Sequence, residues 1–204
     1  MDWAKLFASS FAAGRRARGG RSDDASPHAI EFLSLAPPHP ASLAEPVLLA
    51  QCEVGRGRAA GPGGQHRNKV ETKITIEHGA TGIIAHASER RSQEQNRREA
   101  IFRLRLLLAT HVRCPVPAGE IRTPLWRSRV SGTGLIACNP GHEDYPTMLA
   151  LALDVLAAAQ WDPKTAGLRL CCSPSQLLKL VKDFPHAWGV LAGARARAGL
   201  RPLR

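Results

Sequence analysis

A glycine-rich segment between two alternating segments is the feature that most restricts the fold of this chain. Five of the ten residues from Gly55 to Gly64 are glycine, which permits backbone conformations that other residues avoid. Residues 47–54 before it and residues 70–77 after it alternate between apolar and polar side chains, the period of a half-buried strand. The sequence therefore predicts two strands joined by a long loop. By composition alone, that loop is either a flexible surface hairpin or a phosphate cradle.

A third strand and a long helix are predicted to complete this unit. The tight turn at residues 78–80 lets residues 83–87 return along the second strand. Ser92 and Gln95 form a capping box for a helix that runs to about residue 109. We expect the apolar stripe of this helix to pack against the sheet; the stripe contains Ile101, Leu104 and Leu108, while the other faces carry Arg97, Arg98, Arg103 and Arg105.

Short helices are predicted for the rest of the chain. Residues 147–160 carry leucines and alanines at helical spacing, and Asp162 before Pro163 has the pattern of an N-cap. Ser173 opens another capped helix and Pro185 a last one. The two middle helices fit either a helix-turn-helix or a plain helical bundle. The predicted class is α+β, with a three- to four-stranded sheet packed on a long helix and an all-α C-terminal region.

Composition divides the chain into four parts. Residues 1–44 are expected to form an arm and a linker, because the stretch that ends at Pro46 is rich in proline. Residues 45–112 form the predicted α+β domain, residues 113–145 a connector, and residues 146–204 a helical region with a sparsely basic tail. Apolar residues at helical spacing followed by arginines in the first 40 residues also fit an organelle transit peptide.

The charge of the chain favours a polyanionic partner. There are 28 Lys and Arg against 17 Asp and Glu, a formal net charge of +11, so we expect nucleic acid as the partner. We expect no membrane partner, because no apolar run approaches the roughly 20 residues of a spanning helix. The five cysteines are expected to be reduced thiols. A zinc site from Cys138, His142 and Cys171 or Cys172 is a less favoured alternative.

The glycine-rich loop and the residues after it resemble a known family. Residues 58–66 read RAAGPGGQH, followed by Asn68-Lys69 and Thr81-Gly82-Ile83, and the predicted helix opens with RSQxxNR over residues 91–97. These motifs resemble the GGQ domain of class I peptide-chain release factors, and most of all the short release-factor-like hydrolases that rescue stalled ribosomes. Gly-Gly-Gln alone would be a weak signal, but this combination at these offsets is specific. The resemblance covers about residues 45–112.

The resemblance implies an enzyme that hydrolyses the ester of peptidyl-tRNA on the ribosome. In such proteins the backbone N–H at the position of Gln65 stabilises charge on the reacting oxygen, and Gly63 and Gly64 would allow the backbone to aim it. Water is the nucleophile, so the resemblance implies no cofactor and no metal. It also implies contacts with rRNA and tRNA, largely through phosphates, made by Arg58, His66, Arg67, Asn68, Lys69, Arg91, Ser92, Gln93, Asn96 and Arg97.

The C-terminal half departs from the codon-reading members of the family. Those factors are similar only in the GGQ domain and carry Pro-x-Thr or Ser-Pro-Phe-type tripeptides in a decoding domain, which we do not find here. Ser173-Pro174-Ser175 is better explained as a helix start. We therefore expect rescue of stalled ribosomes without a stop codon. The helical region is expected to contact rRNA, tRNA or mRNA, in the mRNA channel or on the small subunit, through Arg195, Arg197, Arg201 and Arg204.

The expected partners are therefore the rRNA of the large-subunit peptidyl-transferase centre and peptidyl-tRNA. The resemblance adds a methyltransferase that would modify Gln65. The expected location is the bacterial cytoplasm, with the mitochondrial matrix as the alternative if the first residues are a transit peptide. Two other functions remain open: a non-catalytic ribosome- or RNA-binding protein that keeps the loop as an anchor, and a helix-turn-helix DNA-binding regulator.

Overall fold

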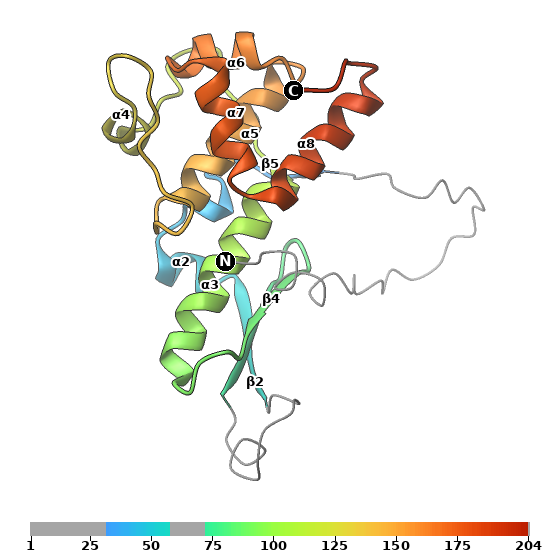
Figure 1. Cartoon of the computed structure of the whole chain (residues 1–204). Coiled ribbons are helices and arrows are strands. Elements are labelled where there is room, and N and C mark those ends of the chain that lie inside the picture. Colours follow the sequence, from blue (N-terminus) through green and yellow to red (C-terminus); the bar gives the residue numbers. More distant parts are fainter. Residues whose placement is uncertain (1–31, 58–71, 204) are drawn as a thin grey trace, which may run out of the picture.

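A small antiparallel sheet carries the glycine-rich segment. The computed structural model describes residues 32–57 and 72–203. Strands β2 (Cys52–Gly57), β3 (Lys73–His78) and β4 (Ile83–Ala87) pair in the order β2-β3-β4 (Figure 1). In this register Cys52 faces His78 and Gly57 faces Lys73, and on the other edge of β3 Ile74 faces Ala87. The predicted hairpins are confirmed. The sheet has three strands, the smaller of the two numbers expected.

The first strand begins later than the alternation predicts. Residues Glu45–Leu49 form the short helix α2, which has Pro46 in its first turn and Leu48 buried. A proline is well placed there because the first N–H groups of a helix have no partner within the helix. The prediction of a strand over residues 47–49 is therefore wrong. Alternation over so few residues could not distinguish a strand from one helical turn that buries a single leucine.

Helix α3 (Gln93–His111) connects the two halves of the structure. Its N-cap is Ser92, whose side-chain oxygen accepts the N–H of Gln95, as predicted. One side of α3 packs on β3 and β4, and the other packs on α5 (Tyr145–Ala158) (Figure 1). The predicted stripe of Ile101, Leu104 and Leu108 is buried. The sheet and the helical region thus meet on one long helix.

The side chains of Arg103 and Arg105 bond within the protein, whereas the sequence predicts that they lie in solvent. Arg103 is buried, forms ion pairs with Glu89 at 2.9 Å and Glu99 at 3.0 Å, and donates to the carbonyl of His86. Arg105 donates to the carbonyls of Ala41 and Leu43 at 2.7 and 2.6 Å. The expectation of an exposed position is wrong for Arg103, because the β4–α3 connection folds over it. Both arginines hold neighbouring segments in place.

The C-terminal region is a packed group of helices. After α5 come α6 (Pro163–Leu170), α7 (Pro174–Lys182) and α8 (Pro185–Arg197). The predicted caps are confirmed: Asp162 accepts the N–H of Thr165, and Ser173 accepts the N–H of Gln176. Helices α6 and α7 pack on α5 and on each other, and α7 packs on α8. The architecture is the predicted α+β class with an all-α C-terminal region.

The turn between α6 and α7 shows how a connection without glycine is built. Cys171 adopts the left-handed conformation with φ of 51°, which glycine usually supplies at the end of a helix. Inside α6, an added Cβ at Gly167 would lie 2.7 Å from the carbonyl oxygen of Cys172. The glycine that this turn requires is therefore in the helix, where the returning chain passes closest.

The segment between the two halves contributes to the same core. It contains the short strand β5 (Val112–Arg113), paired in parallel with β1 (Leu33–Ser34), and the helix α4 (Pro124–Arg129). Trp126 in α4 is 0% exposed and its indole N–H donates to the carbonyl of Leu170 at 2.9 Å. One hydrophobic cluster runs from Ala41, in the 3-10 turn η1 (Pro40–Ser42), to Leu191 in α8. The sequence-based domains therefore share a core.

A buried ion pair lies where β5, α3 and α5 meet. The guanidinium of Arg113 is 3.2 Å from the carboxylate of Asp154, which also accepts the N–H of Cys114 at 3.1 Å. Burial is the largest effect on the pKa of Asp154 and raises it to about 6, while Arg113 works against the rise. The ring of His39 is buried nearby and accepts the N–H of Ala41. These contacts join the N-terminal segment, the end of α3 and α5.

Acid is expected to destabilise the fold through His39. Burial, followed by the charge of Arg113, lowers the pKa of His39 from 6.5 to about 4. The unfolded chain takes up this proton first, so the stabilisation is fully present above pH 6.5 and is lost as the pH falls towards 4. The loss from this group reaches up to about 3 kcal/mol below pH 4. Urea unfolding at pH 7 and at pH 4.5 measures it.

His39→Asn is the matched variant for this test. The asparagine oxygen can still accept the N–H of Ala41, but it does not titrate. Its unfolding free energy should fall less between pH 7 and pH 4.5 than that of the wild type, by about 2 kcal/mol. Equal pH dependence in both proteins would show that His39 does not control the acid response.

Two further expectations concern cysteines and membranes. All five cysteines are free, as predicted; Cys114 and Cys172 are buried, whereas Cys171 is exposed. Among the helices of the described part of the chain, none combines the length and the apolar character needed to cross a bilayer.

Candidate functional site

The base of the glycine-rich segment lies at one end of the β2–β3 hairpin. Gly57 and Lys73 are the last pair of this ladder, so the chain enters and leaves residues 58–71 side by side. The expected catalytic residues and several expected RNA contacts lie outside the described residues: Gly63, Gly64, Gln65, Arg58, His66, Arg67, Asn68 and Lys69. The described part of the site consists of the base of this segment and the start of α3 beside it.

Asn96 occupies a different position from the one the sequence suggested. Its side chain is 0% exposed, and its Nδ2 donates to the carbonyls of Thr72 at 2.7 Å and Arg90 at 2.9 Å. Its Oδ1 accepts the N–H of Arg90 at 2.9 Å. Both amide hydrogens are therefore used within the protein. An RNA contact by this side chain would require it to leave a buried, fully bonded position, which is costly.

The helical spacing of the sequence contained the signal for this burial. Asn96, Ala100, Leu104 and Leu108 follow one another at intervals of four residues and form one stripe of α3. The motif RSQxxNR suggested an RNA contact because Asn96 is polar. The spacing, in contrast, places Asn96 on the buried side of α3. A polar residue on an apolar stripe is expected to bond to backbone groups that lack other partners.

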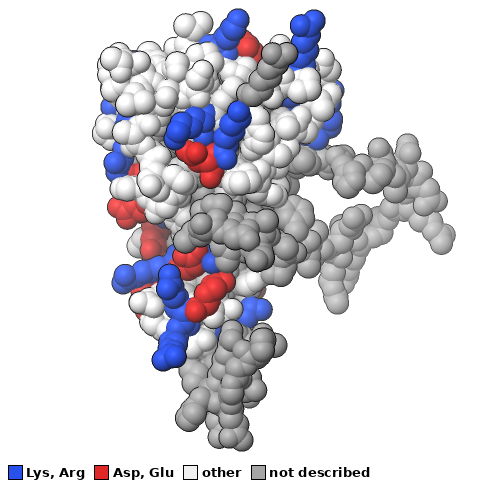
Figure 2. All heavy atoms as spheres, in the orientation of Figure 1, with Lys and Arg blue, Asp and Glu red and all other residues white. Residues whose placement is uncertain are grey.

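The other expected contacts at the start of α3 are exposed or half exposed. Arg91, Ser92 and Gln93 are exposed, although the hydroxyl of Ser92 is also the N-cap. The guanidinium of Arg97 is 3.2 Å from Glu45 and 3.9 Å from Glu94. Exposed pairs of this kind contribute only about 0–1 kcal/mol, so phosphates can compete for the arginine. Figure 2 shows Lys and Arg side chains with acidic ones between them in the lower half of the molecule.

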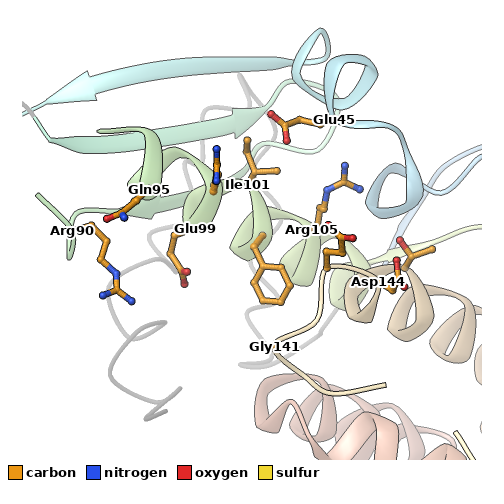
Figure 3. Close-up of a pocket in the computed structure, with 12 residues that line it drawn as sticks. Glu45, Arg90, Gln95, Glu99, Ile101, Arg105, Gly141 and Asp144 are labelled. Atoms are coloured by element: carbon orange, nitrogen blue, oxygen red, sulfur yellow. The ribbon is translucent and has the colours of Figure 1, made fainter. Parts of the chain in front are cut away.

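An open groove of about 990 Å³ runs along α3 beside these residues (Figure 3). One wall carries Arg90, Gln95, Glu99 and Arg105, and the opposite wall includes Asp144 in the loop before α5. The charges of the two walls are mixed in sign, and Glu99 and Arg105 are already bonded to the protein. This groove therefore resembles neither a phosphate site nor a water-activating site, and we assign it no chemistry.

The arginines of the C-terminal tail do not join the base of the glycine-rich segment. Helix α8 lies at the upper end of the molecule, and the ends of β2 and β3 that bracket residues 58–71 lie at the lower end (Figure 1). Arg195 is 9% exposed and donates to the carbonyls of Trp161 and Arg201. It therefore anchors the last residues on the helical region. Arg197 and Arg201 are exposed, and Arg204 lies outside the described residues.

One tripeptide in the helical region does have a form that the sequence was expected to lack. Pro163-Lys164-Thr165 has the form Pro-x-Thr, which we expected to be missing. In the structure these residues form the first turn of α6, and the hydroxyl of Thr165 donates to the N-cap Asp162 at 2.6 Å. The capping bonds give these residues a structural explanation, as at Ser173.

A potential metal-binding group lies in the core and not near the hairpin. Within residues 32–57 and 72–203, one group of three possible ligands comes together: His39, Cys114 and Asp154. The carboxylate already accepts from Arg113 and Cys114, and the two ring nitrogens of His39 contact the backbone at Ala41 and Val112. His142, part of the zinc alternative, contacts Arg129 and Asp144 instead. These bonds favour a structural role for both groups.

Comparisons with known proteins match the segment that contains the hairpin and α3. Residues 49–118 match the RF-1 domain. A peptide chain release factor 1 from Acidiphilium cryptum is 45% identical over 63 residues, which is 31% of this chain and 18% of the relative. That of a Nocardioides species is 42% identical over 67 residues, or 32% and 19%. That of Symbiobacterium thermophilum is 44% identical over 54 residues, or 26% and 15%.

These matches are confined to one part of each protein. The aligned segments span less than a fifth of the length of these relatives. The matched residues of this chain include the RAAGPGGQH segment, the hairpin that brackets it, and α3 with its RSQxxNR start. Residues 49–118 therefore form a domain that is similar to the RF-1 domain and to the matching part of peptide chain release factor 1.

Proposed function

We propose that this protein hydrolyses the ester bond of peptidyl-tRNA on the ribosome and so releases the nascent peptide. The observation that carries the proposal is the presence of Gly63-Gly64-Gln65 within the matched domain, on a segment whose two ends lie side by side at the end of a hairpin. The partners would be peptidyl-tRNA and the rRNA of the peptidyl-transferase centre.

In the proposed mechanism the protein supplies an oriented dipole and the ribosome supplies the rest of the site. The backbone N–H of Gln65 donates to the oxygen that gains charge as water attacks the ester, which lowers the barrier. Gly63 and Gly64 permit the backbone conformation that aims this N–H. The side chain of Gln65 limits the space to a water molecule. No nucleophile from the protein and no cofactor are required.

Contacts with RNA phosphates would hold the hairpin in place. The arginines beside the hairpin include Arg91, which is exposed, and Arg97, which has only a weak surface pair. Phosphate contacts of this kind are sensitive to salt and position the protein without reading a sequence. The other members of the proposed contact set are Arg58, His66, Arg67, Asn68, Lys69, Ser92 and Gln93.

We further propose that release does not require a stop codon. The helical region would dock on rRNA, tRNA or mRNA at a distance from the reacting ester, with Arg197, Arg201 and Arg204 among its contacts. The shared core supports this arrangement, because α5 packs on α3 and the helical region must move with the hairpin as one body. Bacterial relatives favour a cytoplasmic location, and Gln65 is the proposed target of a methyltransferase.

Ribosomes stalled on an mRNA that ends in the P site test this function. Wild-type protein should release labelled peptide from these ribosomes at a rate at least equal to that from ribosomes with a stop codon in the A site. Gly55→Ala is the control for substitution of a glycine in the Gly63-Gly64-Gln65 motif. An added methyl group at Gly55 meets Thr75 only at ordinary contact distances of 3.9 and 4.0 Å. Lys164→Glu with Arg201→Glu, both on the exposed surface of the helical region, should weaken ribosome binding in pelleting assays.

The outcomes separate the possible functions. Release only at a stop codon would contradict the rescue proposal and leave peptide release standing. Ribosome binding without release on either template would favour the non-catalytic RNA-binding alternative. Binding to duplex DNA but not to ribosomes would favour the DNA-binding regulator.

A further inference from the structure

We propose that Asn96 is a positioning residue that fixes the base of the segment carrying Gly63-Gly64-Gln65. This inference rests on the proposed function and assigns Asn96 a role in the rate of the reaction instead of in RNA binding. It follows from three bonds: the Asn96 amide donates to Thr72 and Arg90 and accepts from the N–H of Arg90.

Asn96 bonds to the backbone at the point where the pairing of β3 with its neighbouring strands ends. The last β3–β4 pair is Ile74 with Ala87, and the last β2–β3 pair is Gly57 with Lys73. Thr72 lies one residue beyond the second pair and two residues beyond the first. A backbone carbonyl past the end of a ladder needs another partner if it is to keep one direction. The Asn96 amide supplies that partner at 2.7 Å.

Asn96 also bonds to the turn between β4 and α3, and this turn is itself fixed to α3. In that turn, the Asn96 side chain accepts the N–H of Arg90 and donates to the carbonyl of Arg90. One residue earlier, the carboxylate of Glu89 is 2.9 Å from the buried guanidinium of Arg103, which also donates to His86. The turn is therefore fixed to α3 at two neighbouring residues. Because the Thr72 carbonyl accepts from Asn96 in α3, the chain that leaves residues 58–71 is tied to the same helix that holds this turn.

The consequence concerns the aim of the reacting backbone group. Small errors of position at a reacting centre lower the rate steeply, and a displacement of about 1 Å can cost about 100-fold. The proposed catalytic N–H belongs to the backbone itself, so the direction of the chain at Thr72 contributes to its position. Loss of the Asn96 amide is expected to reduce the rate of hydrolysis at saturation without reducing affinity for the ribosome.

The test compares Asn96→Ala and Asn96→Asp with Tyr145→Phe in the full-length chain. Asp can still accept the N–H of Arg90 but, when ionised at pH 8, cannot donate to Thr72. Tyr145→Phe removes another buried hydrogen bond, from the Tyr145 hydroxyl to the carbonyl of Leu180 at 2.6 Å, far along the chain. Release is measured at saturating protein, ribosome affinity by pelleting, and amide hydrogen exchange at Gly57 and Lys73, the last pair of the β2–β3 ladder, without ribosomes.

Both Asn96 variants should release peptide about 10-fold more slowly at saturation, with unchanged affinity. Exchange at these two amides should accelerate about 10-fold, while Tyr145→Phe leaves both the release rate and the exchange near those of the wild type. Weaker ribosome binding with an unchanged saturated rate would overturn the inference in favour of an RNA contact. Unchanged exchange at Gly57 and Lys73 would overturn it whatever the activity. Accelerated exchange with an inactive wild type would instead reject the proposed function and leave the mechanical connection standing.

Discussion

Gly64→Ala should lower the rate of peptide release from stalled ribosomes by about 100- to 1,000-fold, the range seen when an aligned donor to a developing oxyanion is lost. An added Cβ restricts the backbone conformations available at residue 64 and so turns the N–H of Gln65 away from the ester. Affinity for the ribosome should change little, because the substitution removes no charge and no phosphate contact. Release from ribosomes that lack a stop codon, at saturating protein, measures the effect.

Two variants at Gln65 separate the backbone from the side chain. Gln65→Ala keeps the N–H and should retain more activity than Gln65→Pro, which has no N–H to donate. Gly55→Ala is the matched glycine control and should release peptide at the wild-type rate. If Gln65→Pro were as active as Gln65→Ala, or if Gly64→Ala stayed within threefold of the wild type, the oriented N–H could not be the catalytic group.

Asp154→Asn is expected to lower stability by at most about 3–5 kcal/mol, the usual cost of breaking a buried ion pair by removing one partner. The loss is reduced because burial, which raises the pKa of Asp154, already disfavours its ionised form in the fold. Asparagine can still accept the N–H of Cys114, so the variant chiefly removes the negative charge. Arg113 would then lie buried without its counter-ion, 3.2 Å from a neutral group. Urea unfolding at pH 8 measures the loss, because Asp154 is ionised there even with its pKa raised to about 6.

The double variant Arg113→Met with Asp154→Asn tests the cause of this loss. Methionine removes the unpaired charge and fills apolar space, so the double variant should be more stable than Asp154→Asn alone. An interaction energy of about 2 kcal/mol or more in the double-mutant cycle is expected. If the second substitution destabilised the protein further, the buried charge could not explain the effect of the first.

The local structure of this chain could be predicted well because short-range chemistry decides it. Ser92, Asp162 and Ser173 cap their helices through side-chain bonds to N–H groups two or three residues away, and such contacts need no distant partner. The hairpins follow from alternation and from the turn after His78. The RAAGPGGQH segment indicated the resemblance to release factors before any geometry was known, since its glycines and its glutamine form one contiguous motif.

The role of each polar residue in and around the core was decided by the tertiary structure. Asn96, Arg103 and Arg195 are residue types that usually contact RNA or solvent. The fold buries them against backbone carbonyls or acidic partners instead. Each of these bonds depends on which segments meet after the chain has folded, and neighbouring residues in the sequence do not contain that information.

The sequence by itself determined the similarity of one domain to release factors, the helix starts and the pairing of the hairpins, because these depend on motifs and on contacts between near neighbours. Only the tertiary structure decided that α3 is shared by the sheet and the helical region, that Arg113 and Asp154 meet in the core, and that Asn96 holds Thr72. The physical reason is that a buried polar group must be satisfied by whatever segment packs against it, and that segment is chosen by the whole fold.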